Sequence, residues 1–176
     1  ETDLQAIVPG NNVTLVTLVS FGRDEEAIEL GEAEWPDLAC PGEPEVKRSN
    51  VFKAMNLSLA YERMGQVECA RIILAGILAL LEAQTGLGAK AFGFLDVEVY
   101  ARLGDTDRAL AALRASIDGG MRAQWMMQIE HSPHAEDLHE VAEFRTIRDA
   151  VHAYLAQQLA MVREMEARGE VQPLPR

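Results

Sequence analysis

Three histidines lie among four carboxylates in the segment "EHSPHAEDLHE", residues 130–140. Imidazole and carboxylate groups at close spacing are typical zinc ligands. Pro133 favours the first position of a helix, capped by the serine before it, which leaves His131 outside that helix. On the helix, His134 and His139 would point about 140° apart around the axis and would not converge on one ion. We therefore expect a solvated helix start, with a metal site as the weaker alternative, and no bound metal or cofactor.

The other patterns that could carry chemistry do not indicate an enzyme. Segment 24–45 holds nine acidic residues and no basic one. It suits a solvated outer face, or a docking surface for a basic partner, because acid–base catalysis would need desolvated carboxylates. The segment "GLGAKAFG" (86–93) lacks the preceding strand and the GK[ST] ending of a phosphate loop. Ser20 and Ser116 lack the G-x-S-x-G context of a serine nucleophile, so we expect no catalytic residues.

Two cysteines, Cys40 and Cys69, lack the CxxC spacing of a redox or zinc motif. We expect two unpaired thiols. The alternative, a disulfide, would need an oxidising compartment, and the sequence leaves the cytoplasm and the periplasm open. The longest apolar run, 72–81, has ten residues, about half of what a membrane crossing needs. It predicts a buried helix and no membrane span.

The charge balance limits the partners. The chain of 176 residues has 28 acidic and 16 basic residues, a net charge of −12. This balance argues against a nucleic-acid surface and against binding to an anionic membrane, and it favours a basic or neutral partner. The length and the 48% hydrophobic content predict one globular domain. Because the chain opens with Glu1 rather than Met, we expect it to be a segment of a longer or processed protein.

A spaced pattern recurs along the chain. The strings "YERMGQVECAR" (61–71) and "YARLGDTDRAL" (100–110) hold Tyr, Gly and Ala at the same offsets, and "LVSFGRDEEAI" (18–28) is a weaker copy. The glycine can end one helix in a left-handed conformation, Asp105 can cap the next, and the small alanine allows two helices to cross closely. Residues 11–22 would suit a strand by propensity, and only the repeat register predicts a helix there. The pattern indicates stacked helix–turn–helix units.

These residues resemble the tetratricopeptide (TPR) repeats, whose usual period is about 34 residues. Here the motif glycines are 43 and 39 residues apart. We assign the extra residues of each repeat to the Pro- and Gly-rich loop 34–45, and to a lengthened second helix followed by segment 84–90. The resemblance implies an all-α, TPR-like helical-hairpin solenoid, a right-handed superhelix with a long C-terminal capping helix. The expected single domain, 1–176, divides into repeats at 9–34, 51–84 and 90–118 and a cap at 121–169.

The C-terminal part of the pattern is a long amphipathic helix, expected at 143–168 and ended by Gly169. Its apolar face is marked by Ile147, Val151, Tyr154, Leu155, Gln158 and Val162. A closing helix of this kind covers the last repeat of a solenoid. With Trp125, Pro133, Leu138 and Phe144 in order, the region is similar to the end of TPR regions that follow winged-helix, cyclase-like or kinase domains in bacterial signalling proteins.

The resemblance also implies a binding surface, because TPR solenoids hold an extended peptide or a partner helix in a concave groove. The expected groove residues are Phe52, Met55, Leu59, Glu62, Arg63, Phe94, Glu98 and Arg102. The alternative is that Phe52, Met55 and Phe94 pack under neighbouring helices. We expect a protein-interaction module, the docking or sensing part of a larger bacterial signalling protein. The alternatives are structural self-association, with a possible homodimer, and a small-ligand sensor with a pocket between repeats.

Overall fold

The computed structural model describes residues 11–40, 42–83, 94–122 and 125–172. Every regular element in this part of the chain is helical, which confirms the all-α prediction. The α-helices are α1 (Asn11–Ser20), α2 (Asp24–Glu34), α3 (Val51–Arg63), α4 (Val67–Ala83), α5 (Leu95–Arg102), α6 (Thr106–Asp118) and α7 (Ala142–Ala167). Short elements are η2 (Pro36–Leu38), η4 (Met126–Glu130) and η5 (Glu136–Glu140). The glycine-rich segment 86–93, the lengthening segment 84–90 and the first two residues of the repeat expected at 9–34 lie outside the described residues.

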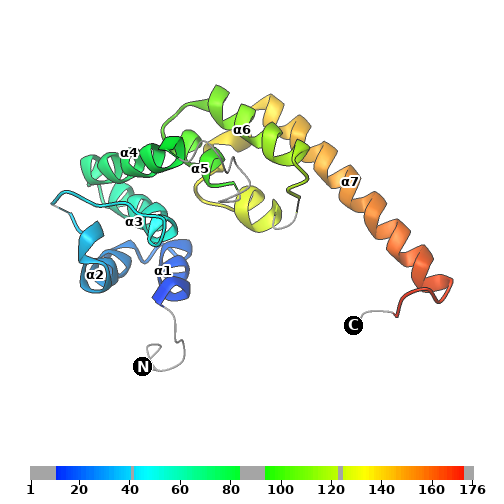
Figure 1. The fold of residues 1–176 in the computed structure, drawn as a ribbon, viewed down its shortest axis with the longest axis horizontal. Coiled ribbons are helices and arrows are strands. Elements are labelled where there is room, and N and C mark those ends of the chain that lie inside the picture. Colours follow the sequence, from blue (N-terminus) through cyan, green and yellow to red (C-terminus); the bar gives the residue numbers. More distant parts are fainter. Residues whose placement is uncertain (1–10, 41, 84–93, 123–124, 173–176) are drawn as a thin grey trace.

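Consecutive helices form three hairpins, α1–α2, α3–α4 and α5–α6, in which the two helices contact each other (Figure 1). The three turns have the same construction. Gly22, Gly65 and Gly104 have φ of 69°, 77° and 74°. In each turn the residue after the glycine donates its N–H to the carbonyl four residues before the glycine, as Asp105 does to Tyr100 over 2.9 Å. This is the Schellman arrangement that only a left-handed residue closes without strain.

Two further local predictions are confirmed. The Asp105 side chain accepts a hydrogen bond from the Arg108 N–H at 3.1 Å and so caps α6. Residues 11–20 form a helix despite their Val and Thr content. Leu15, Leu18 and Val19 are buried at helical spacing, so tertiary burial overrides β-propensity in this segment.

Helix α5 lies between two apolar clusters. Leu95 and Val99 belong to the cluster formed with α1–α4. Val97 and Ala101 belong to the cluster formed with α6, η4, η5 and α7. A helix of eight residues that buries both faces is the contact through which the N-terminal hairpins and the C-terminal region are held together (Figure 1).

The loop between α2 and α3 is attached to the core, and the expectation of unpaired thiols is wrong. Cys40 and Cys69 form a disulfide, with their Cα atoms 6.0 Å apart, within the usual range for this bond. Two contacts bring the loop there. The Leu38 side chain is fully buried, and the Cys40 N–H donates to the Tyr61 hydroxyl at 3.2 Å. The tyrosine of the repeated motif thus positions one end of a covalent link that sequence spacing alone does not indicate.

Helix α7 has the expected position, but only its first half packs on the body. Phe144 and Val151 are buried and Ile147 is partly buried. His152 still bonds Glu130 of η4 and Tyr154 still contacts Arg122, but after these residues the helix runs away from the other elements (Figure 1). The predicted apolar face therefore covers α6 over its first turns and continues into solvent. None of the described helices combines the length and apolar content of a membrane span.

Candidate functional site

Two arginines at equivalent positions of the repeated motif join neighbouring hairpins. Arg63 and Arg102 each stand two residues before a helix-ending glycine. Arg63 Nη1 donates to the Val19 carbonyl oxygen at 2.9 Å, and Arg102 Nη2 donates to the Ser58 carbonyl oxygen at 3.2 Å. Both bonds reach the first helix of the preceding hairpin, and both span 44 residues. The shared string Y-x-R-x-G in the two later copies is the sequence signal that marks this role.

Arg102 is the centre of a buried polar network. Its side chain is 6% exposed. Besides the Ser58 carbonyl, the guanidinium contacts Ser58 Oγ at 3.2 Å, His134 Nδ1 at 3.4 Å and the Glu62 carboxylate. Burial lowers the pKa of Arg102, and the Glu62 charge opposes that shift. An arginine has donors only, so His134 Nδ1 acts as an acceptor and its ring proton is on Nε2.

The expected solvated helix start around His134 is wrong. His134 is 7% exposed, and it lies in a turn, because the next helical element begins only at Glu136. Burial, with the positive charges of Arg102 and Arg63, lowers the pKa of His134 to about 3. The imidazole is therefore neutral at physiological pH and serves as a hydrogen-bond acceptor in the network.

The other two histidines of the segment have separate surroundings. His131 is exposed, whereas the His139 ring stacks on Phe144 with centroids 5.1 Å apart. In the described ranges, no group of three His, Cys, Asp or Glu side chains is placed to hold a metal ion.

Glu98, an expected groove residue, takes part in the same region as a structural group. Ser132 Oγ donates to Glu98 Oε1 at 2.5 Å, and the His134 N–H donates to Ser132 Oγ at 3.3 Å. Burial raises the pKa of Glu98 to about 7, although the Ser132 hydrogen bond and the Arg102 charge act in the opposite direction. Glu98 does not line the neighbouring pocket, so its titration affects folding rather than a bound molecule.

We expect Glu98→Gln to stabilise the protein above pH 7 and to leave its stability unchanged below pH 4.5. A group whose pKa is raised on folding favours the folded state at low pH, and this contribution disappears as the pH rises through the folded value. The rise in the Glu98 pKa from 4.5 to about 7 corresponds to a loss of about 3 kcal/mol of folding stability at alkaline pH. The glutamine keeps the acceptor for Ser132 and removes the charge. Thermal unfolding at pH 5 and at pH 8 measures the difference.

His134 provides the internal control for this profile. Its pKa falls on folding from 6.5 to about 3, so its contribution is complete above pH 6.5 and is lost as the pH falls. The Gln variant should therefore flatten the alkaline side of the stability profile only. The same gain in stability at both pH values would contradict the assignment. A matched variant, Glu25→Gln on the exposed surface of α2, should leave both sides as they are.

A polar pocket of about 160 Å³ lies beside this network. Its lining comes from the ends of α3 and α5, the turn at 133–134 and η5, and consists of Leu59, Glu62, Arg63, Arg102, Pro133, His134, Glu136 and Asp137. Both arginines of the lining already have carboxylate partners, Asp24 for Arg63 and Glu62 for Arg102. Glu136 and Asp137 are exposed and form no salt bridge within the described part of the chain, and the Asp137 charge acts on Arg102 at longer range. The pocket is therefore polar, with two exposed carboxylates at its rim.

The eight expected groove residues do not form one continuous groove. Leu59, Glu62, Arg63 and Arg102 share the polar pocket. Met55 and Phe94 are 1% exposed and belong to the two apolar clusters, whereas Phe52 is 53% exposed and does not line that pocket.

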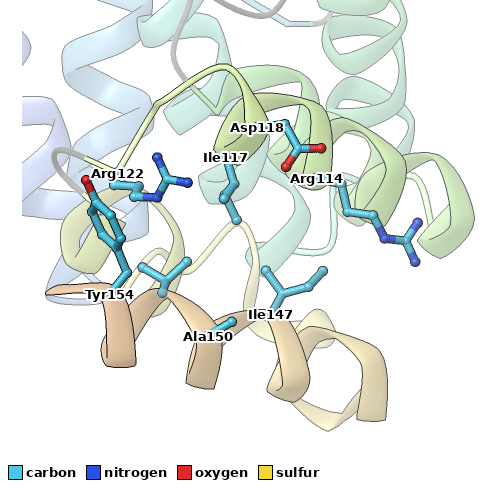
Figure 2. A pocket seen from close by; sticks show the side chains of 8 residues that line it. Arg114, Ile117, Asp118, Arg122, Ile147, Ala150 and Tyr154 are labelled. Atoms are coloured by element: carbon cyan, nitrogen blue, oxygen red, sulfur yellow. The ribbon is translucent and has the colours of Figure 1, made fainter. Parts of the chain in front are cut away.

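A second hollow, of about 250 Å³, lies between α6 and α7 (Figure 2). Its lining is mostly apolar and includes Ile117, Ile147 and Val151. The Arg122 guanidinium lies 4.5 Å from the centroid of the Tyr154 ring and closes one side. Both hollows are smaller than the usual 300 to 1,000 Å³, roughly, of a site for a drug-sized ligand.

Comparison with known proteins gives no match. No protein-family model matches the chain, no curated protein is significantly similar in sequence, and no solved structure is significantly similar in fold. The functional argument therefore depends on the geometry of this chain.

Proposed function

We propose that this chain is a protein-interaction module of TPR-like helical hairpins, the docking arm of a larger bacterial signalling protein. In this proposal it holds a partner segment at the polar pocket between α3, α5 and η5. Two features support the repeat architecture: the three glycine turns of the same construction and the two arginines that join successive hairpins. The observation that carries the functional proposal is the pocket itself, which is built on the second of these arginines.

The chemistry of the pocket favours a basic partner. Three carboxylates, Glu62, Glu136 and Asp137, face two guanidinium groups in the lining, and the neutral His134 adds no charge. Because both guanidinium groups already have carboxylate partners, the rim carboxylates can accept a Lys or Arg side chain of a partner. A space of about 160 Å³ accommodates one side chain rather than a whole ligand. The net charge of −12 would attract a basic segment over a longer range.

A selection from a displayed random-peptide library, with the whole chain as bait, tests this function. We expect enrichment of peptides that contain Lys or Arg. The variant Glu136→Lys/Asp137→Lys should bind them more weakly by about tenfold or more, because it replaces two rim acceptors with like charges. The control Glu25→Lys/Glu29→Lys changes the net charge equally at exposed positions on α2 and should retain binding. Peptides without basic residues, or equal losses in both variants, would contradict the proposal.

A further inference from the structure

The apolar face of α7 follows a heptad spacing along its whole length. Steps of three and four residues alternate through Phe144, Ile147, Val151, Tyr154, Gln158, Met161 and Met165. This alternation is the a/d seam of a helix that pairs with another helix. The first three seam residues are buried or partly buried on the C-terminal apolar cluster. After Tyr154, which contacts Arg122, the seam continues to the end of α7 without a neighbouring element in the described part of the chain (Figure 1).

This second half of α7 (154–167) has an unusual surface for an exposed helix. Residues 151–162 contain no Asp, Glu, Lys or Arg. Tyr154, Leu155, Leu159, Met161 and Val162 are each between 37% and 51% exposed. A solvated helix normally has polar side chains on its outer face, and a contiguous exposed apolar surface marks a site of association.

We propose that the second half of α7 pairs with the same half of a second copy of this chain. The charge distribution favours this occupant. Segment 152–168 has two basic residues, Arg163 and Arg168, and two acidic residues, Glu164 and Glu166, and therefore no net charge. The net charge of −12 comes entirely from the rest of the chain. Two copies repel each other over the rest of their surfaces and can approach along this neutral helix.

The sequence of the seam is also compatible with pairing to itself. Gln158 occupies an a position in the middle of the exposed half, and its amide can both donate to and accept from a polar group of a like helix. A single polar residue at such a position sets the register and the number of strands of a helix pair. Fourteen residues give an interface about 21 Å long, short enough that association should depend on concentration. This pairing uses a different surface from the polar pocket, and its failure would leave the proposed function untouched.

Analytical ultracentrifugation of the whole chain over a range of concentrations tests the proposal. The wild-type mass should rise from 19.4 kDa towards twice that value. Met161→Glu places a charge in the seam and should weaken the dimer by at least about tenfold. Ala156→Glu adds the same charge on the opposite face of the same helix, at the f position, and should dimerise as the wild type does.

Circular dichroism of both variants verifies that α7 remains helical. A wild-type chain that stays at 19.4 kDa at the highest concentration would overturn the proposal and assign this face to a different protein. Equal effects of the two substitutions would overturn it as well, because a seam requires that position 161 matters and position 156 does not.

Discussion

Arg102→Ala is expected to lower the free energy of unfolding by about 3 kcal/mol. The side chain is 6% exposed and donates to both oxygens of Ser58, to Glu62 and to His134. Removing it leaves the His134 ring nitrogen without a donor in a buried region, and an orphaned group of this kind costs about 1–3 kcal/mol. It also leaves a cavity where the arginine stem packed. Denaturant unfolding measures the change.

Alanine substitutions of two other arginines provide a comparison for the loss of stability expected at Arg102. Arg108 pairs with Asp105 on the surface of α6, so Arg108→Ala should cost less than about 1 kcal/mol. Arg63→Ala removes the equivalent bond of the preceding repeat. Because the Arg63 side chain is 34% exposed, water can replace part of the lost hydrogen bonding. The loss of stability should therefore lie between those of the other two variants. Equal losses at 102 and 108 would show that the buried network does not contribute as argued.

Loss of the disulfide is the second large effect that we expect. Cys40→Ser/Cys69→Ser opens a link between residues 29 positions apart, and the chain-entropy relation gives a loss of about 3–4 kcal/mol for a loop of this size. The corresponding fall in Tm is about 10 °C for a domain of this length. The loop that carries Leu38 and Trp35 should detach from the α3–α4 hairpin in the same variant.

A reductant gives the matched control for this prediction. It should lower the Tm of the wild type towards that of the double variant and should leave the variant unchanged. A wild-type Tm that does not respond to the reductant would contradict the assigned contribution. Alkylation of thiols before cell lysis adds a test of location. The bond persists in an oxidising compartment such as the periplasm and is reduced in the cytoplasm, the two compartments that the sequence leaves open.

The features determined by the sequence alone are those that depend on a few neighbouring residues. Gly65 and Gly104 end helices because the left-handed conformation is available to glycine whatever surrounds it. Asp105 caps α6 because its side chain needs only the N–H of a residue three positions on. The helix 142–167 is readable from its own periodicity, and the register of the repeats correctly overrode the β-propensity of α1.

The tertiary structure decided which surfaces these elements bury. Met55 and Phe94 are in the apolar clusters rather than in a groove, because side chains distant in the sequence pack on them, as Trp125 does on Phe94. Periodicity shows that a face is apolar and not which neighbour will cover it. For the same reason α7 matches its predicted bounds, yet its second half lies outside the body.

The polar features that sequence reasoning missed have the same origin. The pairing of Cys40 with Cys69 depends on a loop folding back over α3, and the neutral state of His134 depends on an arginine 32 residues away. The path of the loop sets the first outcome, and burial with nearby positive charges sets the second. Neither leaves a local pattern in the chain. The bonds of Arg63 and Arg102 to the preceding hairpin were also missed, since both residues were expected only as groove residues, although the string Y-x-R-x-G recurs in the sequence.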